Sequence, residues 1–289
     1  MDIVEPRERT HLSVCASSPL ESGHHARSQA TFFALSAGLF AASATVTVVW
    51  CSSMSTMGSM PMPGGWTMSM AWMRMPGQTW LSASASFVLM WVIMMKAMML
   101  PSLAPMLWRY REAVTQTRGM SLGKLTALVG AGYFFVWALC GVLVYPLGVA
   151  LATLAMQWPA LAHTFPVASG TVVVIAGALQ FTSWKIRHLA CCRSAPHCRR
   201  ALEPRASAAW RHGLRLGKHC VFSSAGATAI LLVIGVMDLR AMAVVTAAIS
   251  LERLGPSSNR TARAIGVVAI IAGLLILTRA LEPASMHLS

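Results

Sequence analysis

The chain has 289 residues, of which 56% are hydrophobic and only 11% are charged. An ordinary soluble domain has about 25% charged residues, and here residues 28–73 and 125–184 contain no Asp, Glu, Lys or Arg at all. These runs exclude an ordinary soluble protein and predict an all-α fold, a polytopic membrane helix bundle of six or seven transmembrane helices. The net charge of +14 lies in the loops between apolar runs, so we expect no nucleic-acid partner.

The first thirty residues are polar and mixed in charge, and they precede a multi-pass membrane domain at 31–284. A spanning helix needs about 20 apolar residues. The pattern predicts spans near 31–51, 81–103, 125–148, 166–184 and 264–281. The stretch 219–254 is too long for one ordinary span and short for two, and its "GVMDLR" at 235–240 predicts a bend.

Loop charge predicts the orientation of the spans. The segment 185–218 has nine Lys and Arg residues against the single Glu203, so the positive-inside rule makes it a basic inner loop. The loop 104–124 has four cations and agrees with this orientation. The Met-rich loop 52–80 then faces outward, the N-terminus is cytoplasmic, and the cations near Arg253 favour seven passes over six.

Methionine is concentrated in one region, because fourteen of the twenty methionines fall between residues 54 and 106. Proline and glycine in the outer loop argue against regular helix there. Thioethers are soft, uncharged ligands that favour Cu(I) over zinc or magnesium. The sequence therefore predicts a soft-metal site among the eight methionines of the outer loop: Met54, Met57, Met60, Met62, Met68, Met70, Met73 and Met75.

A second group of thioethers lies on the second span, where Met90, Met94 and Met98 recur every fourth residue and so share one helix face. These residues are further candidate ligands. The alternative is that they only pack, since methionine fills irregular gaps in helix bundles. Lys96 lies on the opposite face of the same helix, where its side chain can extend toward the inner surface; an ion pair with Asp238 or Glu252 is the alternative.

Thiols and imidazoles concentrate at the predicted inner side. The candidate metal ligands there follow the fourth span or begin the next apolar run: His188, Cys191, Cys192, His219 and Cys220. Converging His and Cys pairs could make a four-ligand site. The alternative is that the cysteines are small apolar residues, which is our interpretation of Cys51 and Cys140.

Four segments, "MWVIMMKAMMLPSLAPMLWRYR" (90–111), "GALQFTSWKIRHLACCR" (177–193), "GLRLGKHC" (213–220) and "IGVMDLRAMAVVTAAISLERL" (234–254), resemble a bacterial family of uncharacterised multi-pass proteins regarded as metal-binding integral membrane proteins. The resemblance covers about residues 60–280. It implies a metal at the inner cysteines and a location in the bacterial inner membrane. This chain departs from the family at Ser223 and Ser224, where members have cysteines, and at Lys96, where they have a small or apolar residue.

The favoured function is an integral membrane protein that binds a soft metal ion, Cu(I) first, for transport, handling or delivery. Its expected partners are the lipid bilayer, anionic lipids at the basic loop, and a metal donor or acceptor protein. One alternative is a non-catalytic scaffold or interaction subunit that uses the basic loop. Another is an oxidoreductase that uses Cys191 and Cys192, but we find no catalytic signature and expect no enzyme.

Overall fold

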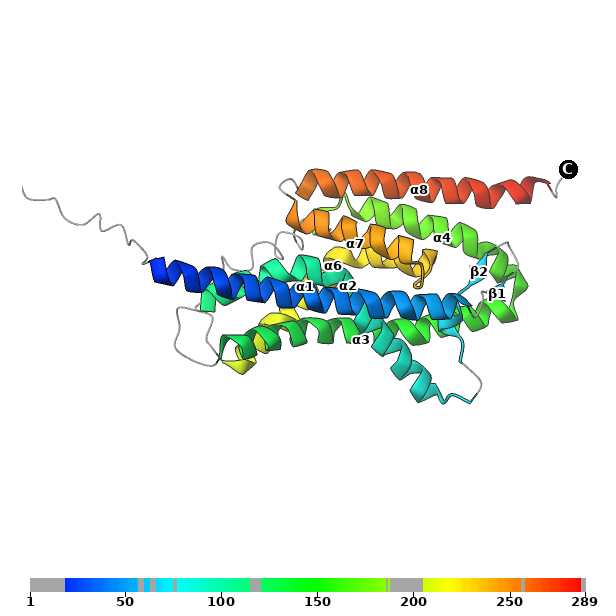
Figure 1. Ribbon diagram of the computed structural model, residues 1–289. Helices are drawn as coiled ribbons and strands as arrows, with labels where there is room; N and C mark the ends of the chain where they lie inside the picture. Colours follow the sequence, from blue (N-terminus) through cyan, green and yellow to red (C-terminus); the bar gives the residue numbers. More distant parts are fainter. Residues whose placement is uncertain are drawn as a thin grey trace, which may run out of the picture.

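The computed structural model describes residues 19–56, 60–62, 66–74, 77–114, 121–185, 187, 205–255 and 258–286. Most of the long helices run side by side along one direction, and the first part of α2 (Trp80–Val114) slants away from them (Figure 1). In chain order they are α1 (Pro19–Thr56), α2, α3 (Leu122–Gln157), α4 (Pro159–Leu179), α6 (Ala206–Ile234), α7 (Leu239–Leu254) and α8 (Ser258–Met286). The predicted all-α helix bundle is therefore confirmed.

Six of the described helices are long and apolar enough to cross a membrane, namely all of those above except α7. Helix α7 has 16 residues, a length of about 24 Å at 1.5 Å per residue. Helix α6 ends just before Gly235, whose φ of 140° suits glycine, and Asp238 then caps α7. The bend predicted in "GVMDLR" is confirmed, and residues 219–254 belong to two helices.

Several helices extend beyond the apolar runs that identified them. Helix α1 begins within the polar N-terminal segment, and α2 continues through Pro101 and Pro105 into the predicted loop at 104–114. Helix α6 begins at Ala206, so residues 206–218 of the predicted basic loop are helical. Hydropathy measures the part of a helix that suits lipid, whereas backbone hydrogen bonding continues into polar sequence.

Helix α2 is the central helix of the bundle. Most of its apolar span is buried inside the protein, whereas every other candidate span buries a third or less. The outer helices instead expose large apolar side chains, such as Leu143 at 71% and Val268 at 66%. In a bilayer these side chains meet lipid, and the side chains of α2 mostly meet protein.

Glycines allow two of the helices to approach closely. A Cβ at Gly177 would lie 2.9 Å from the carbonyl oxygen of Gly266, and one at Gly266 would lie 3.0 Å from that of Gly177. Gly170 and Gly273 face each other in the same way. Small residues at such crossings are typical of packed membrane helices, and they join α4 to α8.

The segment between α1 and α2 folds down onto the helix ends. Strands β1 (Met60–Pro61) and β2 (Thr67–Met68) pair antiparallel, and a short 3-10 helix, η1 (Met70–Trp72), follows. Trp66 anchors the hairpin, because its ring stacks on Phe165 at 4.7 Å and its Nε1 donates to the carbonyl oxygen of Ala162 at 2.9 Å. The outer loop thus covers the same end of the bundle as the α6–α7 turn (Figure 1).

Candidate functional site

A pocket at the end of the bundle that we predict to face outward is lined by four thioether side chains: Met54, Met73, Met90 and Met237. We call it the outer sulfur pocket. Its methionines come from four separate segments, which are the end of α1, the loop after η1, the outer part of α2 and the α6–α7 turn. The space inside it that the centre of a water molecule can reach has a volume of about 70 Å³.

Aromatic rings form the wall of this pocket and fix the outer part of α2. Phe87, one turn before Met90, has its ring centroid 5.2 Å from that of Trp72 and 5.1 Å from that of Tyr145. Trp91 is fully buried and donates from Nε1 to the carbonyl oxygen of Trp137 at 3.0 Å. Tight aromatic packing leaves Met90 a fixed place in the pocket.

Met237 reaches the pocket because of the turn that precedes α7. Asp238 accepts hydrogen bonds through Oδ1 from the backbone nitrogens of Arg240 at 2.8 Å and Ala241 at 3.0 Å. Such an N-cap fixes the first turn of a helix. The adjacent Met237 is therefore held against α1, where its Sδ lies 3.7 Å from the Sγ of Cys51.

The methionine stripe of α2 continues inward from the pocket. Met94 and Met98 are 1% and 3% exposed, and Met95 and Met99 on the neighbouring stripe are fully buried. All four lie in the main hydrophobic core. The stripe is thus a continuous buried line of thioethers, which satisfies both the packing interpretation and the ligand interpretation.

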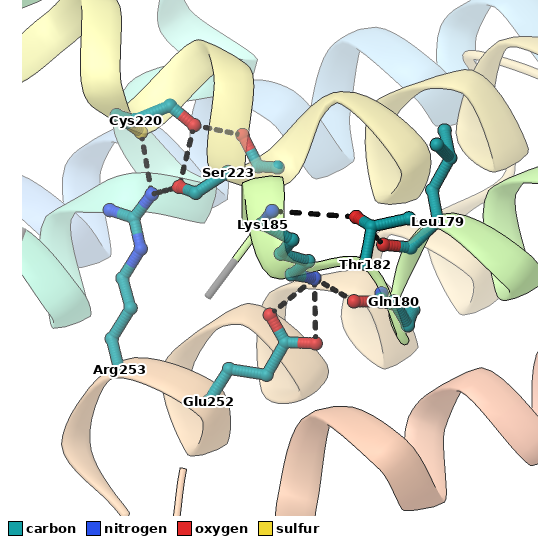
Figure 2. A network of polar contacts seen from close by, with 9 residues as sticks. Leu179, Gln180, Thr182, Lys185, Cys220, Ser223, Glu252 and Arg253 are labelled. Atoms are coloured by element: carbon teal, nitrogen blue, oxygen red, sulfur yellow. Dashed lines mark hydrogen bonds and ion pairs between the residues drawn. The ribbon is translucent and has the colours of Figure 1, made fainter. Parts of the chain in front are cut away.

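Met99, on the neighbouring stripe, meets the fully buried Cys220 of α6. The Sγ of Cys220 lies 3.8 Å from the Sδ of Met99 and 2.8 Å from the hydroxyl oxygen of Tyr133. Arg253 of α7 donates from Nη2 to the same sulfur at 2.8 Å and to Ser223 Oγ at 3.1 Å, as Figure 2 shows. One buried thiol therefore meets a thioether, a phenol and a guanidinium.

An ion pair lies beside this cluster. Lys185 and Glu252 are joined at 2.9 Å between Nζ and Oε2, and both side chains are 6% exposed. Lys185 also donates to Gln180 (Figure 2). Glu252 thus ties α7 to the end of α4, while Arg253 ties α7 to α6. These charged contacts join the inner ends of the helices.

The predicted loop ligands have different environments. Met54 and Met73 line the outer sulfur pocket. Met62 and Met68 are 8% and 3% exposed and pack with Ala152 and Ala155 of α3, and Met60 is exposed in β1. Met57, Met75 and the side chain of Met70 lie outside the described residues.

The predicted inner site lies mostly outside the described residues, because His188, Cys191 and Cys192 all belong to that part of the chain. His219 is half-buried on α6 beside Cys220. Among the described residues, no three His, Cys, Asp or Glu side chains gather where they could hold a metal ion. The described residues instead bring methionine side chains together, in the outer sulfur pocket.

Sequence patterns alone did not point to two features of this region. Met237 lies outside the methionine-rich region 54–106, and its only signal is its place in the predicted bend. Lys185 and Glu252 lie 67 residues apart, so only the fold pairs them. Lys96 instead has its ammonium 6.0 Å from the ring centroid of Phe134, while Glu252 binds Lys185 and Asp238 caps α7.

A family model described as PpoB2, copper chaperone, matches residues 88–276, which is 189 of the 289 residues. The matched region runs from the outer part of α2 into α8 and includes Met90, Met237, Cys220 and Arg253. No curated protein and no solved structure matches the chain.

Proposed function

Since the chain belongs to the copper chaperone family, we propose that it is an integral membrane protein that captures Cu(I) in the outer sulfur pocket and hands it on. The observation that carries this proposal is the convergence of four thioethers from four segments on one pocket. Packing alone would not require four separate segments to place the same kind of side chain at one cavity. Three or four such sulfurs are enough to hold Cu(I).

The chemistry of the pocket suits capture rather than permanent storage. A thioether has no proton to lose and no charge, so it binds Cu(I) without the strong attraction of a thiolate. An ion held by neutral ligands is released readily to an acceptor of higher affinity. Apolar and aromatic walls, such as Trp50 and Phe87, disfavour hydrated hard cations because those ions keep several waters.

The test replaces the four pocket methionines, Met54, Met73, Met90 and Met237, together with leucine. Leucine has nearly the same volume, so each change should cost less than about 1.5 kcal/mol of stability. We expect the affinity for Cu(I), measured by competition with a chelator under reducing conditions, to fall by about tenfold or more. Elemental mass spectrometry of the purified protein gives the copper content in parallel.

A matched control has leucine at four buried methionines outside the outer sulfur pocket: Met62, Met68, Met95 and Met242. This variant removes as many thioethers and should keep the affinity of the unaltered protein. Equal affinity for Cu(I) in all three proteins would refute the outer sulfur pocket as the capture site. Equal loss in both variants would mean that the thioethers act only through packing.

A further inference from the structure

A second cavity lies directly inward of the outer sulfur pocket. Four of its eight lining side chains bear sulfur: Cys51, Met90, Met94 and Met237. Met90 and Met237 also line the outer pocket, so the two cavities share a wall. Cys51 precedes Met54 by three residues on α1, and Met94 follows Met90 by four on α2, which places the second cavity roughly 5 Å deeper at 1.5 Å per residue.

The thiol of Cys51 donates to the thioether of Met237, and the separation of these two sulfur atoms also suits two ligands of one metal. A thiolate sulfur binds a tetrahedral metal at about 2.3 Å, and that geometry places neighbouring sulfurs about 3.8 Å apart. The distance from Cys51 Sγ to Met237 Sδ is 3.7 Å. Cys51 is 4% exposed and Met94 is 1% exposed, so lipid and bulk water do not compete for them.

The size of the cavity favours an ion without water. Its volume, measured as for the outer pocket, is about 10 Å³, which is about the minimum that one water molecule needs. The outer pocket, with about 70 Å³, has room for several. An ion that moves from the first cavity to the second therefore exchanges water and thioethers for sulfur alone.

The thiol of Cys51 can also neutralise the charge of a bound cation, which thioethers cannot do. A monovalent cation among neutral ligands keeps its full charge, and a charge deep in a membrane protein is costly. A thiolate ligand cancels that charge, so the complex at the deeper cavity is neutral. The outer pocket has four thioethers, and the deeper cavity has three thioethers and one thiol. The ligand that can neutralise the ion thus lies at the deeper cavity, where a buried charge costs more.

We propose that Cys51, with Met94, Met90 and Met237, forms a second Cu(I) site that receives the ion from the outer sulfur pocket. This inference rests on the proposed function of that pocket. In the transfer the bonds from Cu(I) to Met54 and Met73 break, and bonds to Cys51 and Met94 form. The thiol proton of Cys51 is released to water in the outer pocket. Copper stays Cu(I), and no electron is transferred.

The experiment uses the full chain in detergent, titrated with Ag⁺ as a redox-stable probe, and measures both affinity and proton release in weak buffer. Binding to a thiol site releases about one proton per ion, whereas binding to thioethers releases none. The deep variant is Cys51→Ser with Met94→Leu. We expect its Ag⁺ affinity to fall by about tenfold or more and its proton release to fall by about one per protein.

The matched control is Cys140→Ser with Met95→Leu. It alters a half-buried thiol and the buried methionine that follows Met94, and it should change neither the Ag⁺ affinity nor the proton release.

A third variant, Cys51→Met, keeps a soft ligand and an apolar side chain, so it remains informative if the deep variant does not fold. It should bind Ag⁺ without releasing the proton. Unchanged proton release in Cys51→Met would overturn the second site. The variant Met54→Leu with Met73→Leu tests only the outer pocket. If that variant binds like the unaltered protein while the deep variant loses its proton release, the capture site is wrong and the deeper site stands.

Discussion

The outer and inner halves of α2 both contribute side chains to the core, but they meet different chemistry. At the outer end its side chains join Met54, Met73 and Met237, which are neutral and soft. In the inner half, Ser102 accepts a hydrogen bond from Nη1 of Arg253 at 3.4 Å, and the adjacent Glu252 of α7 forms its ion pair with Lys185. One half of the helix therefore meets thioethers, which we propose as ligands of a soft ion, and the other half meets polar contacts that join helices.

Buried sulfur thus has two different environments in one core. Cys220 is fully buried, yet its sulfur meets a phenol and a guanidinium in addition to Met99. Cys51 is also buried, and the sulfur contact that the structure gives it is a thioether. The surroundings of each thiol, rather than its burial, distinguish the charged inner cluster from the sulfur cavities.

The largest expected loss of stability comes from removing one partner of the Lys185–Glu252 ion pair. Glu252→Ala leaves the ammonium of Lys185 buried without its carboxylate, which typically costs about 3–5 kcal/mol, in the upper range for a single substitution. Thermal unfolding in detergent should show a strongly lowered Tm. The double variant Lys185→Met with Glu252→Leu, which removes both charges, should be markedly more stable than Glu252→Ala. If the single variant unfolds like the unaltered protein, the ion pair does not hold α7.

A smaller effect should follow from loosening the outer end. Asp238→Ala removes the cap of α7, and loss of an N-cap costs about 1 kcal/mol. Because Met237 is the preceding residue, its sulfur should lose its fixed place, and we expect Cu(I) affinity to fall by a few fold in a chelator competition. Asp238→Asn keeps a capping side chain and should restore both stability and affinity. If Cu(I) affinity did not recover in Asp238→Asn, the cap of α7 would not be what positions Met237 for the metal.

The last prediction concerns the effect of acid on Cu(I) binding. Thioethers carry no proton, so Cu(I) capture by the outer pocket should stay constant from neutral pH to about pH 5. Binding at a thiol releases a proton and so weakens by up to about tenfold for each unit that the pH falls. Chelator competition at several pH values should give a flat profile for Cys51→Met and a sloped one for the unaltered protein. A sloped profile in Cys51→Met would indicate a second thiol or imidazole ligand.

Much of the fold was predictable because lipid imposes a simple rule on the sequence. A span must satisfy its backbone internally and present apolar side chains, so long charge-free runs identified the helices, and "GVMDLR" identified the break before α7. The ends of the helices were not predictable, since polar residues such as those after Ala206 continue the helix outside the apolar run. The hairpin that buries Met62 and Met68 depends on α3 and α4, which local sequence does not reveal.

The regional enrichment of thioethers and the helix face that carries three of them could be read from local sequence. Methionine enrichment and the four-residue spacing of Met90, Met94 and Met98 are local facts, and helical periodicity converts them into one face. Which thioethers meet one another depends instead on long-range packing. Met237 and Cys51 lie 186 residues apart, and contacts of that range depend on how the helices pack around α2.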